Sequence, residues 1–221
     1  MACKGKQGGR RTRSQNRNHR TSEPVTWLFV CEGETECNYV KSLVAYANSK
    51  SNGVKIKAIT KPAGKTSKEL MNHAVKIDEY DVRKDIDYER VFVLFDLDFD
   101  PDKPTKTKNF DKAVGMGGDR YTPIWSNDCF ELWFIFHFEC LRSDIGRKQY
   151  AEKLKNHLGV EQYDKTADIF SLIHKDVKTA LCHAGKRNIE CSDKLNPSEK
   201  VACTQMFVLI KSLENRLKFK F

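Results

Sequence analysis

Two clusters of acidic side chains in this 221-residue chain could perform chemistry that a stable fold alone does not require. The first, residues 32–36 (EGETE), follows an apolar segment at 27–31. The second begins at Asp96 and Asp98, directly after the apolar residues 91–95. Two carboxylates about 4 Å apart repel each other by about 4 kcal/mol at an effective dielectric constant near 20. A cation among them removes this repulsion, and several hard oxygen ligands favour Mg²⁺ or Mn²⁺.

Other interpretations of the second cluster account for less of the pattern. An EF-hand loop opens with D-x-D-x-D but requires glycine at its sixth position and glutamate at its twelfth, where Pro101 and Thr107 stand. A solvated acidic turn explains Asp100 and Asp102 by themselves. It does not explain two acidic clusters that each follow a buried strand, so we favour a metal site.

The elements that must position these clusters are predicted from hydrophobic periodicity. Strands are predicted at 25–31, 54–58, 91–95 and 121–125, and helices from residue 36 and residue 70. From about residue 128 the chain is predicted to be wholly helical. Alternating strands and helices indicate an α/β fold, with a parallel sheet flanked by helices and a helical C-terminal part. Ligand sites in such sheets lie at the carboxyl edge of the strands, where both acidic clusters fall.

One segment that resembles a nucleotide-binding loop has a simpler interpretation. Residues 63–70 (AGKTSKEL) contain the Gly-Lys-Thr ending of a P-loop, but Ile59 stands where that motif needs its first glycine. Thr66 and Glu69 have the spacing of a capping box ahead of the second predicted helix. The segment is therefore predicted to begin a helix.

Composition limits the class of protein. Hydrophobic residues make up 39% of the chain, which is enough for a sizeable core, and the eight cysteines include no C-x-x-C pair. No apolar run approaches the roughly 18 residues that cross a bilayer, and no apolar segment follows the basic N-terminus. We therefore expect an intracellular, cytoplasmic protein with no membrane contact.

The positive charge is concentrated at the N-terminus. Of the formal net charge of +9, seven units belong to residues 1–22, which contain no acidic residue. This segment is predicted to be a disordered basic arm that contacts nucleic-acid phosphates. A solubilising tail without a specific partner is the alternative. The arginines predicted to bind nucleic acid are Arg10, Arg11, Arg13 and Arg17.

The ordered set of motifs resembles a Toprim domain, which topoisomerases, bacterial primases and overcoming-lysogenization-defect nucleases share. The chain is more similar still to the RloB-like family, across most of residues 25–217. The motifs that carry the resemblance are FVCEGETECNYVKSL, VFVLFDLDFD and SNDCFELWFIFHFE, with weaker support from YDKT and NPSE. Two positions depart from the family pattern, which has proline where Asp128 stands and threonine where Glu199 stands.

The resemblance implies roles for individual residues. Glu32 matches the general acid/base of phosphoryl transfer and is also a candidate ligand, while Asp96 and Asp98 match the Mg²⁺ ligands. Glu36 is a further candidate ligand. The domains implied are a Toprim-like catalytic domain at 23–142 and a helical region at 143–221.

Other positions have two interpretations each. Glu131 is either a metal ligand or, with Asp128, part of a capping box. Tyr163 and Lys165 either meet nucleic acid or lie in a solvated loop. Asn196 either belongs to the site or caps a helix with Pro197 and Glu199 behind it. His137 is expected to be a hydrogen-bonded core histidine.

The implied function is Mg²⁺-dependent cleavage of RNA or DNA by a bacterial phage-defence effector with an ATPase partner. One rival is a non-catalytic nucleic-acid-binding module whose carboxylates hold a structural ion. A second rival is a primase-like nucleotidyl transferase.

Overall fold

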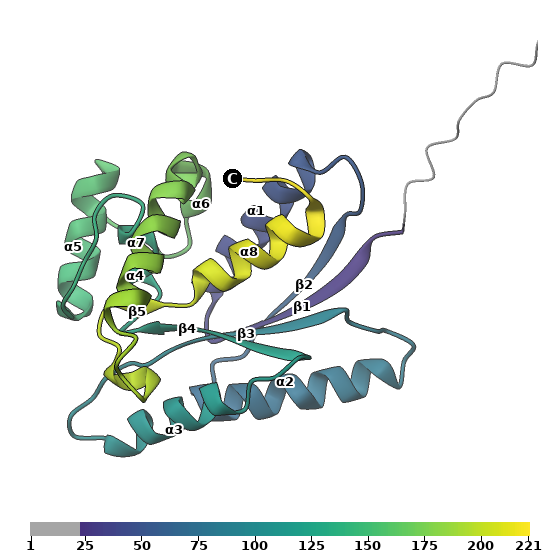
Figure 1. The fold of residues 1–221 in the computed structure, drawn as a ribbon, viewed down its shortest axis with the longest axis horizontal. Helices are drawn as coiled ribbons and strands as arrows, with labels where there is room; N and C mark the ends of the chain where they lie inside the picture. The colour runs from purple at the N-terminus through teal and green to yellow at the C-terminus, as the bar shows by residue number, and fades with distance from the viewer. Residues whose placement is uncertain (1–22) are drawn as a thin grey trace, which may run out of the picture.

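The computed structural model describes residues 23–221 as helices packed on both faces of one sheet (Figure 1). The predicted basic arm at 1–22, with Arg10, Arg11, Arg13 and Arg17, lies outside the described residues. The strands are β1 (Val25–Cys31), β2 (Ile56–Pro62), β3 (Arg90–Asp96), β4 (Tyr121–Asn127) and β5 (Cys203–Thr204), in the order β2-β1-β3-β4-β5. The first four are parallel, and β5 runs antiparallel to β4. The predicted α/β fold is confirmed.

The helices form two layers. In Figure 1, α2 and α3 cover one face of the sheet, and α1, α8 and the remaining C-terminal helices lie on the other. The helices are α1 (Glu34–Lys50), α2 (Ser67–Val82), α3 (Pro104–Gly115), α4 (Glu131–Ile135), α5 (Gly146–Leu158), α6 (Ile169–Ile173), α7 (Val177–Glu190) and α8 (Met206–Leu217). Two short 3₁₀ helices, η1 (His174–Asp176) and η2 (Pro197–Glu199), complete the list.

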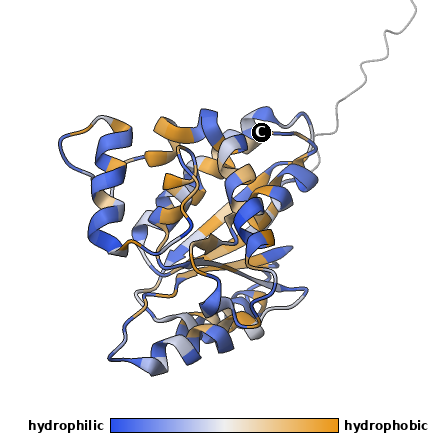
Figure 2. Cartoon of the chain, turned by 60° about the vertical axis from the view of Figure 1, so that its left-hand side comes forward, coloured by the Kyte–Doolittle hydropathy of each residue, from blue (hydrophilic) through white to orange (hydrophobic). Residues whose placement is uncertain are grey.

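The central strands are apolar on both sides because both faces of the sheet are covered. Trp27 and Phe29 belong to the core on the side of α1 and α8, whereas Leu28 and Val30 belong to the core on the side of α2 and α3. Figure 2 shows this as hydrophobic strands enclosed between two layers of amphipathic helices. Burial of contiguous apolar residues is the main stabilising contribution to these strands.

Two predictions about the elements need correction. The chain after residue 128 is not wholly helical, because Cys203–Thr204 form β5 beside β4. A two-residue strand is too short to produce a periodic pattern. Helix α3 was not predicted, because Phe110 and Ala113 are its only buried residues and too few to mark a helix in the sequence.

The C-terminal region contributes to the same core as the N-terminal region. Leu209, Leu213 and Leu217 of α8 are buried in one apolar cluster with Trp27 and Phe29 of β1. The predicted boundary at residues 142–143 thus separates two regions that share a core.

Candidate active site

Carboxylate side chains from three regions of the chain line one small cavity at the carboxyl edge of the sheet. This carboxylate cavity has a volume of about 170 Å³. Its lining residues are Glu32, Gly33, Thr35, Glu36, Asp96, Asp98, Phe130, Glu131, Arg147 and Lys165. The five acidic residues predicted as metal ligands are therefore brought together, and Lys165 lies with them.

Glu32 is held between the central strands and the loop before α2. Its backbone N–H donates to the carbonyl of Leu94 at 3.0 Å, and its carbonyl accepts from the N–H of Gly64 at 2.9 Å. Its Oε2 accepts a hydrogen bond of 3.2 Å from the N–H of Asp96. Burial raises the pKa of Glu32, and the charge of Glu36 raises it further. Such a carboxyl group can exchange a proton closer to neutral pH than an exposed one can.

Glu36 and Asp96 are buried carboxylates whose ionisation is opposed by the acidic side chains around them. Burial raises the pKa of Glu36, and the charge of Glu131 adds to the effect. Burial also raises the pKa of Asp96 well above its usual range, with further contributions from Glu36 and Glu32. Each has one backbone partner: Glu36 Oε2 accepts from the N–H of Gly33 at 3.2 Å, and Asp96 Oδ2 accepts from the N–H of Phe130 at 3.0 Å.

Asp98 leaves the strand in a left-handed backbone conformation, with φ of 49°, which aspartate tolerates better than most residues. Its N–H donates to the carbonyl of Asp128 at 3.1 Å, and its carboxylate is paired with the guanidinium of Arg147. Arg147, from the first turn of α5, also lies 3.8 Å from Asp96. An arginine from the C-terminal region thus compensates the second acidic cluster.

Glu131 is compensated by Lys165 in a similar way. The Nζ of Lys165 lies 3.1 Å from Glu131 Oε1. Lys165 is presented by a turn in which Asp164 Oδ1 accepts from the N–H of Thr166 at 2.8 Å. The buried hydroxyl of Tyr163 has no hydrogen-bond partner in the described part of the chain; burial raises its pKa, and the charge of Glu131 raises it further. Lys165 therefore lines the cavity, whereas Tyr163 does not.

The donor set fits a hard divalent cation. Five carboxylates around one cavity supply the oxygen ligands that Mg²⁺ prefers, and burial, with a further contribution from neighbouring acidic charges, raises the pKa values of Glu32, Glu36 and Asp96. Tyr150, like Tyr163, has a buried hydroxyl without a partner among the described residues, but neither side chain lines the cavity. No three acidic, histidine or cysteine side chains within 23–221 already surround one ion position. Arg147 and Lys165 instead neutralise Asp98 and Glu131.

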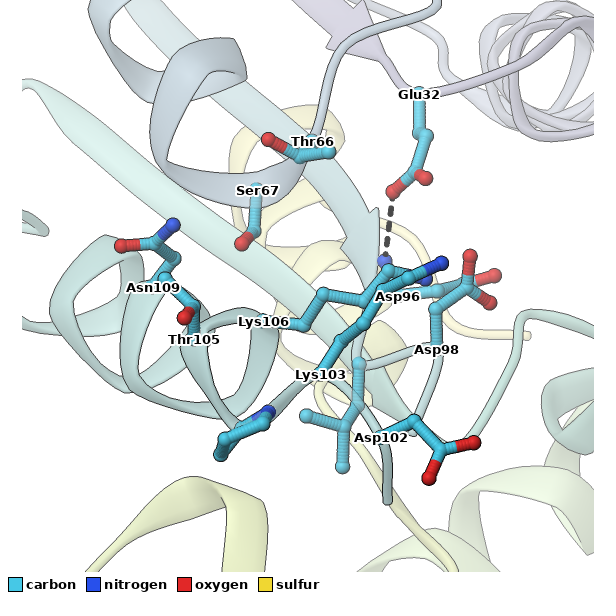
Figure 3. Close-up of a pocket in the computed structure, with 12 residues that line it drawn as sticks. Glu32, Thr66, Ser67, Asp96, Asp98, Asp102, Lys103, Thr105, Lys106 and Asn109 are labelled. Atoms are coloured by element: carbon cyan, nitrogen blue, oxygen red, sulfur yellow. Dashed lines mark hydrogen bonds between the residues drawn. The ribbon is translucent and has the colours of Figure 1, made fainter. Parts of the chain in front are cut away.

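A second, larger cavity of about 400 Å³ lies between the first turns of α2 and α3, and we call it the α2–α3 pocket (Figure 3). It shares Glu32, Asp96 and Asp98 with the carboxylate cavity. Its other lining residues are Thr66, Ser67, Leu97, Asp102, Lys103, Pro104, Thr105, Lys106 and Asn109. The carboxylates thus form a wall between two cavities.

Several predicted details can now be assigned. Helix α2 begins at Ser67 with Thr66 as its cap, and η2 begins after Asn196 with the predicted capping box to Glu199. Asn196 lines neither cavity. His137 is buried and its Nδ1 hydrogen-bonds to the carbonyl of Trp133 at 2.9 Å, which confirms a core histidine.

Of the two interpretations of Glu131, the capping box with Asp128 is contradicted by the structure. Helix α4 begins at Glu131 without a side-chain cap. Asp128 instead accepts a hydrogen bond of 2.7 Å at Oδ1 from the N–H of Phe99 and so stabilises the loop that carries Asp98. The spacing of Asp128 and Glu131 fits a capping box, but the Asp128 carboxylate bonds to the loop after β3 and not to the start of α4.

Arg147 and Lys106 are site residues that sequence reasoning missed. Arg147 is 49 positions from the aspartate that it contacts, and no local motif marks it. Lys106 lies in the unpredicted helix α3, where Pro104 at the first helical position was the available signal.

Comparison with known proteins identifies one family. The model of a family described as RloB-like protein matches residues 27–213, which include every lining residue of the carboxylate cavity. No curated protein and no solved structure matches the chain. Along residues 23–221, none of the helices has both the length and the apolar character needed to cross a membrane.

Proposed function

Because this chain belongs to the RloB-like protein family, we propose that it is a Mg²⁺-dependent nuclease that cleaves phosphodiester bonds of RNA or DNA. The observation that carries the proposal is the carboxylate cavity. Five acidic side chains meet there with two cationic ones, Arg147 and Lys165. An acidic site of this kind repels a nucleic acid unless a cation is bound, so the donor set supports a metal-dependent reaction.

Asp96 and Asp98 would hold the cation, with Glu36 and Glu131 as further ligands. Bound there, Mg²⁺ would neutralise charge on the phosphate and lower the pKa of a water molecule. Asp96 is oriented for this by its hydrogen bond from the N–H of Phe130, and Asp98 by its backbone bond to Asp128.

Glu32 would move the proton. It adjoins Asp96 through a hydrogen bond of 3.2 Å from the Asp96 N–H, and burial raises its pKa. As a carboxylate it can accept a proton from the attacking water, and as a carboxylic acid it can return a proton to the leaving oxygen.

Arg147 and Lys165 would contact the substrate phosphate. Both now neutralise acidic side chains, at Asp98 and Glu131. When a cation takes over those carboxylates, the guanidinium and ammonium groups can donate hydrogen bonds to phosphate oxygens instead. The site would then need residues both from the ends of the strands and from the C-terminal region.

The biological setting is also a proposal. The family resemblance supports a phage-defence role in a bacterial cytoplasm, with an ATPase partner from the same locus.

The replacement Glu32→Gln tests the proposal. Glutamine keeps the size and hydrogen bonding of glutamate but cannot accept a proton at neutral pH, so cleavage should fall by about 10²-fold or more. Labelled tRNA, single-stranded DNA and duplex DNA are incubated with each protein in Mg²⁺ or EDTA. Nucleic-acid affinity should change little, because Asp96 and Asp98 remain.

Glu34→Gln is the matched control. Glu34 belongs to the same acidic cluster but is exposed and does not line the carboxylate cavity. It should cleave like the wild type. Full phage protection by a folded Glu32→Gln protein would contradict the nuclease proposal and favour the non-catalytic binding module.

A further inference from the structure

The α2–α3 pocket offers a set of unpaired hydrogen-bond donors next to the carboxylate cavity. Helix α2 begins there, and its cap Thr66 donates its hydroxyl to Glu69 at 2.9 Å without capping a helix N–H. Within residues 23–221, the N–H groups of Ser67, Lys68 and Glu69 have no acceptor. These groups carry the partial positive charge of a helix N-terminus, which attracts anions.

Ser67 is an independent indication that the pocket receives a ligand. Its side chain is buried, with only 6% of the residue exposed, and it lines the pocket. Its hydroxyl has no hydrogen-bond partner in the described part of the chain and points into the space between α2 and α3 (Figure 3). The hydroxyl is not one of the fully buried unpaired groups of the described chain, so it opens onto the pocket and is free to donate to a ligand oxygen there.

Helix α3 adds positive charge from the opposite side of the pocket. Lys106 lines the pocket, is half-buried and forms no ion pair with any described residue. Lys103 also lines it but is paired with Asp100 at 3.4 Å. Figure 3 shows Ser67 apart from the carboxylates Glu32 and Asp98, whereas Lys103 and Lys106 extend from α3 toward Asp96.

The position of these donors is fixed relative to the carboxylates. The N–H of Gly64 donates to the carbonyl of Glu32 at 2.9 Å, which ties the start of α2 to the end of β1. Gly64 has a φ of +58°, a conformation that glycine adopts without strain. The segment is not a P-loop, yet the helix start beside it faces the same acidic residues as the candidate active site.

We propose that the α2–α3 pocket binds a backbone phosphate of the nucleic acid, next to the phosphate held at the carboxylate cavity. The proposal rests on the proposed function for the identity of the ligand. Ser67 and the first N–H groups of α2 donate to the phosphate oxygens, and Lys106 neutralises their charge. The pocket therefore sets the register of the strand across the shared wall of Glu32, Asp96 and Asp98.

The test measures binding, so that it is independent of cleavage. A fluorescent single-stranded RNA oligonucleotide is titrated into the Glu32→Gln protein in Mg²⁺, at several salt concentrations. Adding Lys106→Gln should weaken binding about tenfold and reduce the slope of log K against log salt by about 0.7. Adding Ser67→Ala should weaken binding about threefold at an unchanged slope. Lys108→Gln, on the exposed side of α3, is the matched charge control and should leave affinity near that of the parent.

Inorganic phosphate as a competitor separates two sources of the anion. If Lys106→Gln weakens competition by phosphate but not oligonucleotide binding, the pocket takes a free anion and the proposal is overturned. Equal affinity and slope in the Lys106→Gln and Lys108→Gln proteins would also overturn it. If the wild type never cleaves RNA or DNA but the expected losses of binding appear, the phosphate site stands and the nuclease proposal fails.

Discussion

Asp96 destabilises the metal-free fold but serves the proposed chemistry, because its carboxylate is buried among like charges. Asp96→Asn removes a charge yet keeps an oxygen that can accept from the N–H of Phe130. The metal-free protein should therefore become more stable, and each gain of about 1 kcal/mol would raise Tm by about 2–4 °C. Affinity for Mn²⁺, measured by calorimetric titration, should fall sharply.

Asp100→Asn is the control for that replacement. Asp100 lies in the same loop but outside the carboxylate cavity, paired with Lys103 at 3.4 Å. It should leave the Mn²⁺ affinity unchanged. Undiminished affinity in the Asp96→Asn protein would remove Asp96 from the metal site.

His137 should make stability depend on pH. Burial lowers its pKa to about 4, so at mildly acidic pH the unfolded chain binds the proton more readily than the folded protein. The contribution to the free energy of unfolding is therefore complete above pH 6.5 and is lost as the pH falls toward 4. Between pH 7.5 and 5 the loss should be about 2 kcal/mol.

His137→Phe should flatten this part of the stability profile, as measured by urea unfolding at both pH values. Phenylalanine keeps the aromatic contact with Trp133, whose ring centroid lies 5.0 Å from that of His137. Glu32, Glu36 and Asp96 titrate in both proteins with raised pKa values and act in the opposite direction, so their contribution cancels in the difference. If stability depends on pH equally in both proteins, the folded protein protonates His137 as readily as the unfolded chain does.

At the scale of elements, the start of α2 depends on Gly64. Alanine has open space for its Cβ there but must adopt a φ of +58°. Gly64→Ala should therefore cost about 1–2 kcal/mol of stability and weaken oligonucleotide binding, because the first turn of α2 shifts away from Glu32. Gly185→Ala, inside α7, also meets open space but has ordinary helical geometry, and it should stabilise the protein by about 0.5–1 kcal/mol. Equal effects of the two replacements would contradict the strained conformation.

At the scale of the whole molecule, charge is divided between the N-terminal segment and the rest of the chain. Residues 1–22 carry seven of the nine net positive charges, and the described residues are close to neutral. If the segment contacts phosphates, deleting it should flatten the slope of log K against log salt by about 0.7–0.9 per lost contact. Affinity should fall similarly for all sequences, because backbone contacts carry no sequence information.

A full-length variant keeps chain length constant in that experiment. It replaces Arg10, Arg11, Arg13 and Arg17 by glutamine and should reproduce most of the change in salt slope that the deletion causes. A salt slope equal to that of the wild type in both proteins would leave the segment a solubilising extension.

The sequence by itself determined the parts that depend on local patterns. Contiguous apolar residues predicted β1 and β3, and each ends in its acidic cluster because a carboxylate is disfavoured inside a covered strand. Helical spacing predicted α1 and α2, and the carboxyl-edge rule for parallel sheets predicted that Glu32 and Asp96 would meet.

Only the tertiary structure decided what surrounds those carboxylates. Arg147 and Lys165 reach them from segments 49 and 34 residues away from their acidic partners, and Asp128 bonds to the loop after β3 instead of its own helix. Strand β5 has only two residues and α3 buries only two, so neither gives a local pattern long enough to predict it. A local pattern in the sequence shows which side of an element is buried. Contacts between distant segments depend on how the elements pack against one another, and residue spacing carries no information about this packing.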